Sequence, residues 1–425
     1  MKIFADLHLH SKYSRATSDN LNLEYVERYG KIKGLNLVGT GDFQHPLWFK
    51  ELKANLKDLE NGLFYFNDKN FLFILQTEIS NIYEQDGKSR RIHNIVLSPN
   101  FEIAEQIIEY LKPRGKIESD GRPILAGLDC VEFTESLMKI SKDIVIIPAH
   151  AWTPWYGVFG SKTGFNSLKE CFKDQVKHIF AIETGLSSDP AMNWRLSELD
   201  NIAFISNSDC HSPWPWRLGR ELNVFETKEP SYKELMNIIK ERDPKRFLFT
   251  VEVDPSYGKY HWDGHRNCQV FLEPKDAIKY KNICPVCRRP LTVGVLHRVE
   301  ELADREEGFV PKEHIPFKTM LPLSELIATI HNTEPFSKKV WEEHNKLTKV
   351  FGTELDILLN VEKERLTHIV GDSLSDLIIK NRGGLLKVQP GYDGVYGKVI
   401  LQGEISRKLP QKTLDSFLLS KNIDS

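Results

Sequence analysis

The sequence has no strong excess of charge of either sign. Its 57 lysine and arginine residues nearly balance 59 aspartate and glutamate residues, and the net charge is −2 at pH 7. Overall basicity, the usual mark of proteins that bind nucleic acid nonspecifically, is therefore absent. Basic residues cluster locally at 88–91, 112–116 and 288–289. Such runs are common on solvated surfaces, so none of them alone indicates a binding patch.

Long apolar runs are also missing, which excludes a membrane-spanning helix. The sequence passes directly from Met1-Lys2 into a strand-like segment, so no signal peptide is predicted. We therefore expect a cytoplasmic protein without a membrane partner. A length of 425 residues exceeds one ordinary hydrophobic core and predicts two or three domains.

Cysteine is scarce. Three of the six cysteines are scattered, and the other three lie between residues 268 and 287. In a reducing cytosol such a cluster indicates a metal site rather than a disulfide. Two ligand pairs, each with two intervening residues, are typical of a closed structural zinc site, with His261 and His297 as alternatives to the first ligand. The predicted ligands are His265, Cys268, Cys284 and Cys287.

Up to about residue 250, short apolar runs alternate with helical patterns. The expected strands are 3–7, 35–39, 71–76, 92–97, 144–147, 179–182, 202–206, 222–225 and 247–251. The expected helices include 102–111, 131–141, 167–177 and 232–241. This alternation predicts a parallel sheet covered by helices, and the number of repeats favours a closed barrel.

The expected domains are a barrel over 1–254, a zinc-binding module over 255–300, a mainly helical region over 301–400 and a tail over 401–425. Glycines between residues 383 and 397 would allow the backbone to approach a phosphate or another chain closely, and a plain tight turn explains them equally well.

Potential metal ligands follow nearly every expected strand of the first domain. They are His8, His10, Asp42, Glu78, His93, His150, Glu183, Asp209 and His211. Helix capping would explain a single aspartate at such a place, but it does not explain five histidines. In α/β barrels the functional residues gather at the carboxyl ends of the strands. The pattern therefore predicts a metal-binding cleft at that end.

Within this cleft the sequence suggests a grouping. His8 and His10 point to one side of a strand and, with Glu78 and Asp209, could hold one ion. Glu78 could bridge to a second ion at His93 and His150. A third ion could sit at Asp42 and His211. The expected cofactors are two or three divalent ions, such as zinc, manganese or magnesium, because mixed nitrogen and oxygen ligands disfavour calcium.

Such ions activate water and clamp a phosphate ester, so phosphoester hydrolysis is the expected reaction. The predicted catalytic residues are Asp209, Glu78 and His150. Arginines near the cleft could neutralise phosphate charge, and tryptophans after the ligands could stack an extruded base or simply anchor loops. The candidates for contact with DNA or a base are Arg15, Arg91, Trp152, Glu183, Trp216 and Arg217.

The ordered motifs resemble those of the PHP (polymerase and histidinol phosphatase) superfamily. They are Asp6 to Ser11, Gly41-Asp42, Glu78, His93, His150 and Asp209-Cys210-His211. The resemblance implies a distorted (β/α)7 barrel with a multinuclear metal site. Many members carry a histidine where Arg15 and Ala16 stand, and an Asp-His pair where Asp42-Phe43 stands. These departures put the third metal position in question.

The later segments, including residues 265–287, 291–302 and 390–397, resemble the archaeal endonuclease Q family. That resemblance implies a DNA repair enzyme that flips a base and nicks on the 5′ side of uracil, hypoxanthine, xanthine or an abasic site, in double- or single-stranded DNA. The alternative is a small-molecule phosphatase such as histidinol phosphatase, which shares the metal site but needs no zinc module.

The tail is similar to the peptide with which repair proteins bind the sliding clamp PCNA, and the resemblance implies that partner. The residues concerned are Gln411, Leu414, Phe417 and Leu418. A terminal helix that packs on its own domain would show the same periodicity.

Overall fold

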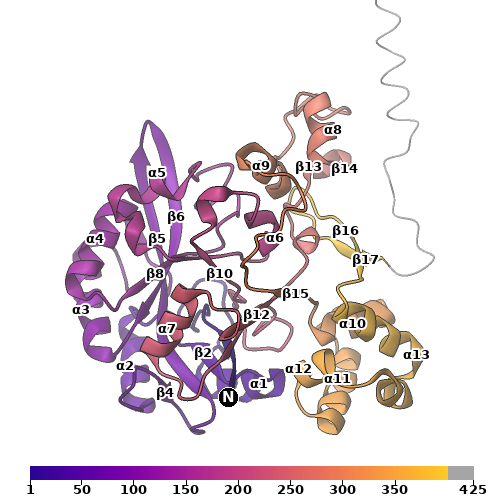
Figure 1. Cartoon of the computed structure of the whole chain (residues 1–425), viewed down its shortest axis with the longest axis horizontal. Coiled ribbons are helices and arrows are strands. Elements are labelled where there is room, and N and C mark those ends of the chain that lie inside the picture. The colour runs from indigo at the N-terminus through magenta and orange to yellow at the C-terminus, as the bar shows by residue number, and fades with distance from the viewer. Residues whose placement is uncertain (401–425) are drawn as a thin grey trace, which may run out of the picture.

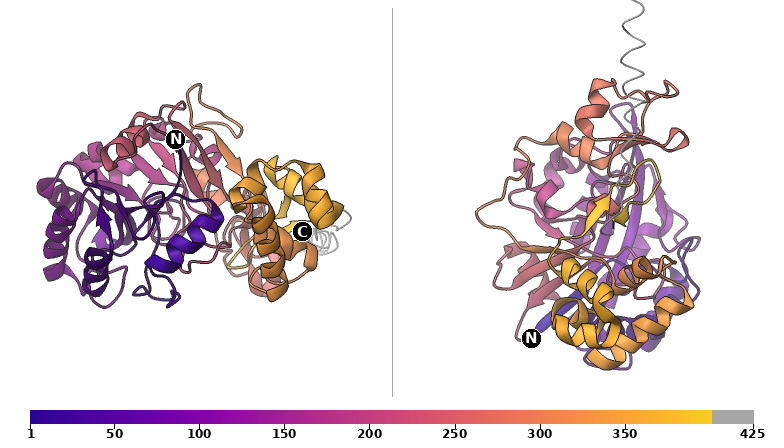
Figure 2. Two further views of the ribbon diagram at one scale, coloured as in Figure 1. Left: turned by 90° about the horizontal axis from the view of Figure 1, so that it is seen from below. Right: turned by 90° about the vertical axis from the view of Figure 1, so that its right-hand side faces the viewer.

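The computed structural model describes residues 1–400. It shows an α/β body, a small region around α8 (Pro274–Lys279), and a helical part that lies beside the body (Figures 1 and 2). The clamp-peptide prediction falls on residues 411–418 and lies outside the described residues. None of the helices in the described part is long and apolar enough to cross a membrane.

A mixed sheet forms the centre of the body. Its main path runs β15 (Phe317–Thr319), β12 (Phe247–Glu252), β11 (Leu222–Glu226), β1 (Lys2–Asp6), β2 (Leu37–Gly39), β5 (Leu72–Gln85), β4 (Phe64–Tyr65) and β3 (Lys57–Asp58). β6 (Lys88–Ser98) pairs with β5 and with β8 (Val145–Pro148), and β7 (Ile124–Ala126) pairs with β5. β9 (Ala181–Glu183) and β10 (Ala203–Ile205) form a separate parallel pair.

The expectation of a parallel sheet is wrong for several strands. β1 and β2 are parallel, as are β2 and β5, but β1 pairs antiparallel with β11, and β5 pairs antiparallel with β6. Asp86 and Gly87 make the tight turn between β5 and β6 with positive φ angles of 54° and 69°. An Asp-Gly turn between two strand-like runs directs the chain into a hairpin.

Single backbone contacts connect the two sheets near the carboxyl ends of their strands. Ala151, after β8, donates its N–H to the carbonyl of Glu183 (2.9 Å), and His10, after β1, donates to that of Cys210 (3.3 Å). These contacts bring the segments after β1, β8, β9 and β10 to one place.

Helices pack around the sheet, and their starts are set by capping side chains. They are α1 (Leu23–Lys33), α2 (Pro46–Asn55), α3 (Phe101–Leu111), α4 (Cys130–Ile140), α5 (Leu168–Phe172), α6 (Pro190–Asn193) and α7 (Tyr232–Glu241). Asn22, Asn100, Asp129 and Ser231 each accept a hydrogen bond from the first turn of the helix that follows. The helix expected over 167–177 is the short α5 followed by the 3₁₀ helix η2 (Lys173–His178).

The remaining elements follow the body in sequence. β13 (Asp263–His265), η5 (Arg266–Cys268), β14 (Val270–Leu272) and α8 precede α9 (Val295–Leu302). The helical part holds α10 (Leu323–His331), α11 (Lys338–Phe351), α12 (Glu354–Leu359) and α13 (Lys363–Arg382), then the hairpin β16 (Lys387–Gln389) and β17 (Lys398–Ile400). β15, which the helical expectation for 301–400 did not include, pairs with β12 and ties this region to the central sheet.

Candidate metal centre

Two groups of metal-ligand side chains meet at the end of the sheet where β1, β8, β9 and β10 end. The ligand atoms of the first group all lie within 4.8 Å of one another, as do those of the second, and Glu78 belongs to both. The first group is His8, His10, Glu78 and Asp209, and the second is Glu78, His93 and His150. These are the two groupings that the sequence suggested.

In the first group, the two histidines face the fully buried carboxylate of Glu78 on β5. Oε2 of Glu78 lies 3.4 Å from Nε2 of His10 and 3.7 Å from Nε2 of His8. Oδ1 of Asp209 lies 3.1 Å from Nε2 of His10. Nε2 of His8 is buried and has no hydrogen-bond partner. A bound cation would give this buried nitrogen a partner and would also offset the charge of the two carboxylates that it faces.

The second group uses the other oxygen of Glu78. Oε1 lies 2.8 Å from Nδ1 of His93 on β6 and 3.1 Å from Nε2 of His150 after β8. Burial alone would raise the pKa of Glu78, but His93 and Arg122 hold it well below its usual range. Burial lowers the pKa of His93 to about 4. A neutral imidazole and an ionised carboxylate are the forms that bind metal.

Two further carboxylates lie behind the histidines. Oδ1 of Asp42 is 3.1 Å from Nδ1 of His10, and its Oδ2 accepts hydrogen bonds from the N–H of Ser11 and the hydroxyl of Ser14. Oε1 of Glu183 is 3.0 Å from Nδ1 of His8. Within residues 1–400, Asp42 joins neither ligand group. Each of these carboxylates therefore holds the Nδ1 atom of a histidine, and Glu183 lies behind His8.

His211 lies beside the first group without joining it. Its ring centroid is 4.6 Å from that of His10, and its Nδ1 is 3.1 Å from the carbonyl oxygen of Asp209. Asp42 and His211, the third grouping expected from the sequence, belong to none of the groups of three or more ligand residues within residues 1–400. Asp42 is occupied by His10, Ser11 and Ser14 instead.

Arg122 is a site residue that the sequence pattern did not indicate. It comes from the loop before β7, and its guanidinium donates to Oε2 of Glu78 at 3.2 Å. The loop approaches so closely at Gly121 that a Cβ there would lie 2.2 Å from Oδ2 of Asp42. The pair Gly121-Arg122 was the available sign of this residue in the sequence. Nothing local in the sequence shows that its loop returns to the metal centre.

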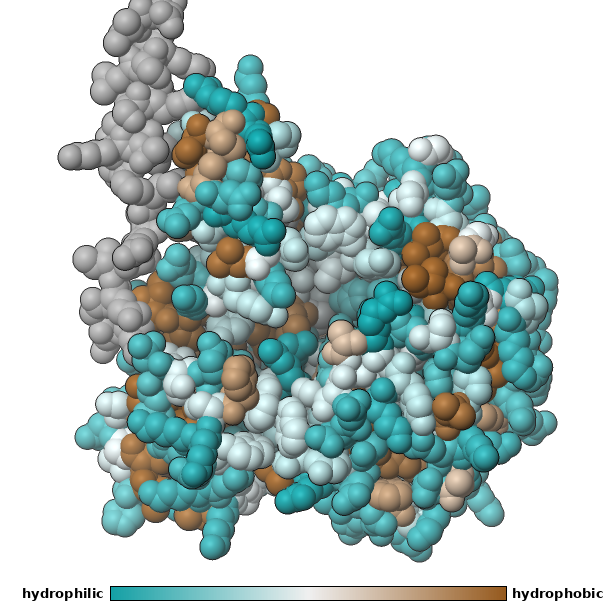
Figure 3. Space-filling view, turned by 180° about the vertical axis from the view of Figure 1, so that it is seen from behind, coloured by the Kyte–Doolittle hydropathy of each residue, from teal (hydrophilic) through white to brown (hydrophobic). Residues whose placement is uncertain are grey.

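A cavity of about 390 Å³ opens at the second ligand group. His93, His150 and Asp209 line it together with Arg122 and Arg15. The opposite wall comes from the segment after β12, with Gly258, Lys259 and Tyr260, and from Tyr396. Figure 3 shows the surface hollowed between the body, the α8 region and the helical part.

The predicted DNA-contact residues separate into two kinds. Arg15 and Arg91 remain near the cavity, Arg15 on its rim and Arg91 with its guanidinium 5.9 Å from the Tyr156 ring centroid. Trp152 is fully buried and donates its indole N–H to Asn193, so it is a core residue and cannot stack an extruded base.

Trp216 and Arg217 belong to a smaller adjoining cavity of about 40 Å³. Trp216 stacks on Trp214 and contacts Trp341 of the helical part. The tryptophans that follow the ligands thus mainly anchor loops.

The cysteine cluster also comes together. The ligand atoms of His265, Cys268, Cys284 and Cys287 lie within 4.8 Å of one another, and Nδ1 of His265 is 3.4 Å from Sγ of Cys287. The two alternative histidines do not join this group. His297 pairs with Asp263 at 2.7 Å, and His261 is buried beside Ser256.

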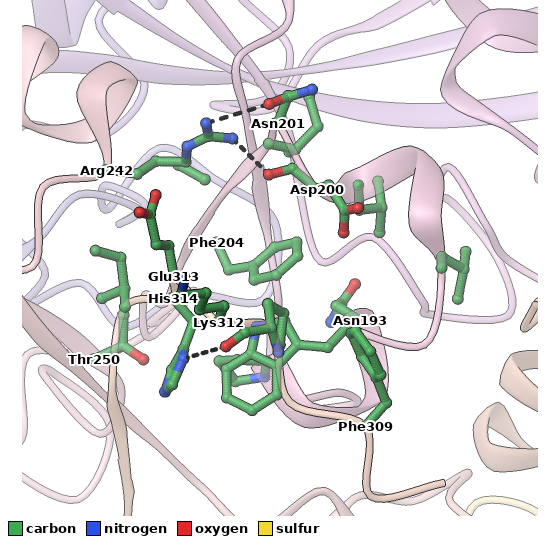
Figure 4. Close-up of a pocket in the computed structure, with 18 of the residues that line it drawn as sticks. Asn193, Asp200, Asn201, Phe204, Arg242, Thr250, Phe309, Lys312, Glu313 and His314 are labelled. Atoms are coloured by element: carbon green, nitrogen blue, oxygen red, sulfur yellow. Dashed lines mark hydrogen bonds between the residues drawn. The ribbon is translucent and has the colours of Figure 1, made fainter. Parts of the chain in front are cut away.

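Another cavity, of about 350 Å³, lies away from both ligand sites (Figure 4). Its two arginines are already paired. Arg305 forms two contacts of 2.6 and 2.7 Å with the carboxylate of Asp200, and Arg242 donates to the Asp200 carbonyl and to Asn201.

Comparison with known structures decides the family. The crystal structure of the lesion-specific endonuclease PfuEndoQ from Pyrococcus furiosus matches with a TM-score of 0.85 and 33% identity, over 98% of this chain and 99% of that one. The chain belongs to the endonuclease Q family. It is therefore a DNA endonuclease, and the prediction of a hydrolase is confirmed.

Further matches agree with this membership. A structure of Endonuclease Q in complex with a 27-mer duplex substrate, with an abasic lesion at the active site, matches with a TM-score of 0.84 and 34% identity, over 96% of this chain and 98% of that one. Residues 322–384 match the family model of the MJ0043 C-terminal domain. The protein MJ0043 of Methanocaldococcus jannaschii is 31% identical over 275 residues, 63% of this chain, but this chain spans only 34% of that protein's length.

Proposed function

We propose that the chain is a metal-dependent repair endonuclease that nicks DNA on the 5′ side of a deaminated base or an abasic site. The single observation that carries this proposal is Glu78, whose two oxygens face two separate sets of histidines in one buried centre. A carboxylate shared in this way is typical of adjacent divalent ions in phosphodiester hydrolysis. The duplex with an abasic lesion bound by a family member supports the substrate class.

The residues present fit two divalent ions. The first would be held by His8, His10, Glu78 and Asp209, and the second by Glu78, His93 and His150. When bound, such ions lower the pKa of water and offset the charge of the phosphate. Asp209, Glu78 and His150 are the proposed catalytic residues, because each lies at the ligand centre and beside the cavity or the shared carboxylate.

Other side chains position this centre. Asp42 and Glu183 accept from Nδ1 of His10 and His8, which leaves the Nε2 atoms free to face the carboxylates. Arg122 presents a fixed positive charge beside Glu78, where it can bind a non-bridging oxygen of the scissile phosphate. His211, half exposed beside Asp209, is placed to move a proton at the mouth of the centre.

The lesion would enter by base flipping. Damaged and abasic positions unstack at low cost, which gives selectivity before any contact with the base. Trp155 and Tyr156 line the cavity and are available for stacking, whereas Trp152 is buried. These two aromatic residues replace Trp152 in the proposed base contact.

The proposal includes the outer parts of the chain. The group of His265 and three cysteines suits one structural zinc ion in the module over 255–300, between a barrel over 1–254 and a helical domain over 301–400. The contacts between the segments after β1, β8, β9 and β10 support closure of the distorted barrel. The tail over 401–425 would bind the clamp PCNA.

One experiment separates this proposal from a small-molecule phosphatase. The purified protein is incubated with divalent metal and either a duplex containing one uracil, the same duplex with cytosine, or histidinol phosphate. We expect a single nick 5′ of uracil and no release of phosphate from histidinol phosphate. Phosphate release without any nick would refute the proposal.

A further inference from the structure

A basic pocket lies at the opposite end of the strands from the metal centre. Its volume is about 390 Å³, and it is lined at the beginnings of β8 and β9 and along α7. His150 and Glu183, by contrast, belong to the carboxyl ends of these two strands. We name this cavity the lysine pocket, after Lys142, Lys177, Lys233 and Lys240, which line it.

The lysine pocket carries positive charge that the protein does not neutralise. Within residues 1–400, none of the four lysines forms an ion pair, and Asp143 is the single acidic residue in the lining. Burial lowers the pKa of His178 in the wall, and Lys142 and Lys177 lower it further. The cavity of Figure 4 differs, because its Asp200 is already paired with Arg305. The lysine pocket thus gathers four lysines without an ion pair, whereas the two arginines in the cavity of Figure 4 already contact Asp200.

Its floor is apolar and fixed. Met138, Met236 and Tyr232 are buried there, next to Phe180. The Tyr232 hydroxyl donates to the carbonyls of Leu97 (3.1 Å) and Asp143 (2.7 Å), so its ring cannot turn away.

One wall is closed by a glycine. Gly62 has φ of +81°, and a Cβ there would lie 2.5 Å from Cβ of Tyr232, so any other residue would push the wall apart. A preformed concave site with an apolar floor and a few charged groups is the usual form of a small-molecule site.

We propose that the lysine pocket binds a nucleotide carrying two or more phosphates. The base would lie on the methionine and tyrosine floor, and the phosphates would meet the ammonium groups on the rim. Lysine is a compact, mobile point charge suited to a flexible phosphate chain. A nucleic-acid strand is the less fitting ligand, because the pocket is a concave site at the end of the molecule that faces away from the nuclease cavity.

The test is calorimetric titration of ATP into the full chain as purified, with its metals bound. We expect the Lys177→Gln/Lys233→Gln variant to bind ATP at least about ten-fold more weakly, because two charge-assisted contacts are lost. Lys50→Gln, which removes an exposed and unpaired lysine outside the pocket, should bind like the wild type. Unchanged affinity in the double variant, or no binding by the wild type, would overturn the proposal.

Three further arms locate the bound nucleotide and identify its chemistry. Asp209→Ala should bind ATP normally, and loss of binding there would place the nucleotide at the nuclease centre instead. Inorganic tripolyphosphate should bind more weakly than ATP, since it lacks a base for the floor. If a single-stranded oligonucleotide displaces ATP at comparable affinity, the ligand of the pocket is nucleic acid and the proposal is overturned. Matching melting temperatures establish that the variants are folded.

Discussion

Arg122 donates a hydrogen bond of 3.2 Å to Oε2 of Glu78, the carboxylate shared by the two ligand groups. Its side chain is 28% exposed, so it reaches from solvent to a fully buried partner. The pKa of Arg122 is raised above its ordinary value, although burial opposes this, because Glu78 and Asp209 lie beside it. A permanent positive charge therefore stands where the scissile phosphate of the proposed reaction would lie.

Arg122→Lys is expected to slow nicking by roughly 10²-fold, because a single ammonium cannot reproduce the paired donors of a guanidinium. The measurement is the single-turnover rate on a duplex containing one uracil. Arg114→Lys is the control, since Arg114 lies outside the cavity and donates to the carbonyl of Tyr110. A rate for Arg122→Lys equal to that of the control would refute the phosphate-binding role.

Lys33 and Glu354 join the body to the helical part. Nζ of Lys33 lies 2.7 Å from Glu354, and both side chains are almost fully buried. His344 is 2.9 Å from the other carboxylate oxygen. Lys33→Met should cost roughly 3–5 kcal/mol of unfolding free energy, because it leaves a buried carboxylate without its cation. Urea titration measures this cost.

Lys139→Met gives the matched control for Lys33→Met. Lys139 pairs with Glu135 on the exposed surface of α4, and its loss should cost less than about 1 kcal/mol. Equal costs for the two variants would show that the Lys33 pair does not hold the two parts together.

Glu252 gives a prediction about pH. Burial raises its pKa to about 7, above the ordinary value of 4.5. The folded protein therefore holds a proton that the unfolded chain has lost between about pH 4.5 and 7, so stability should fall as pH rises through this window. Glu252→Gln should lose less unfolding free energy between pH 5 and pH 8 than the wild type, as measured by urea unfolding at the two pH values. An unchanged slope would show that Glu252 is ionised in the folded state.

Cys284→Ser should remove the proposed structural zinc. Cys284 is buried in the four-ligand group, so the ion would lose a thiolate and residues 263–291 should become sensitive to proteases. Zinc content is measured by mass spectrometry of the purified protein. Cys171→Ser, a buried cysteine far from the group in sequence, should keep its zinc. Full zinc content in Cys284→Ser would refute the site.

The sequence indicated much of the centre because its residues recur at strand ends. His8 and His10 are two residues apart, and Glu78, His93 and His150 follow or lie on further strands. The strand-end pattern therefore placed them at one end of the sheet. It could not place Arg122, whose loop is brought to Glu78 only by tertiary packing.

Other features needed information that the sequence pattern did not give. The Asp86-Gly87 turn is visible in the sequence, but the expected strands 71–76 and 92–97 end short of it, so the hairpin of β5 and β6 was not predicted. Trp152 follows a ligand in sequence, yet its ring packs inward against Phe159. Asp42 and Glu183 have the chemistry of ligands, and only the directions of His10 and His8 show that they lie behind them.

Glu78→Gln tests the central claim most directly. The nicking rate on a uracil-containing duplex is measured at saturating divalent metal, together with the metal content of the protein. Because both groups share this carboxylate, we expect both ions to be lost and nicking to fall by at least about 10³-fold, with the fold intact. Nicking within about ten-fold of wild type, with the metal content unchanged, would contradict the account.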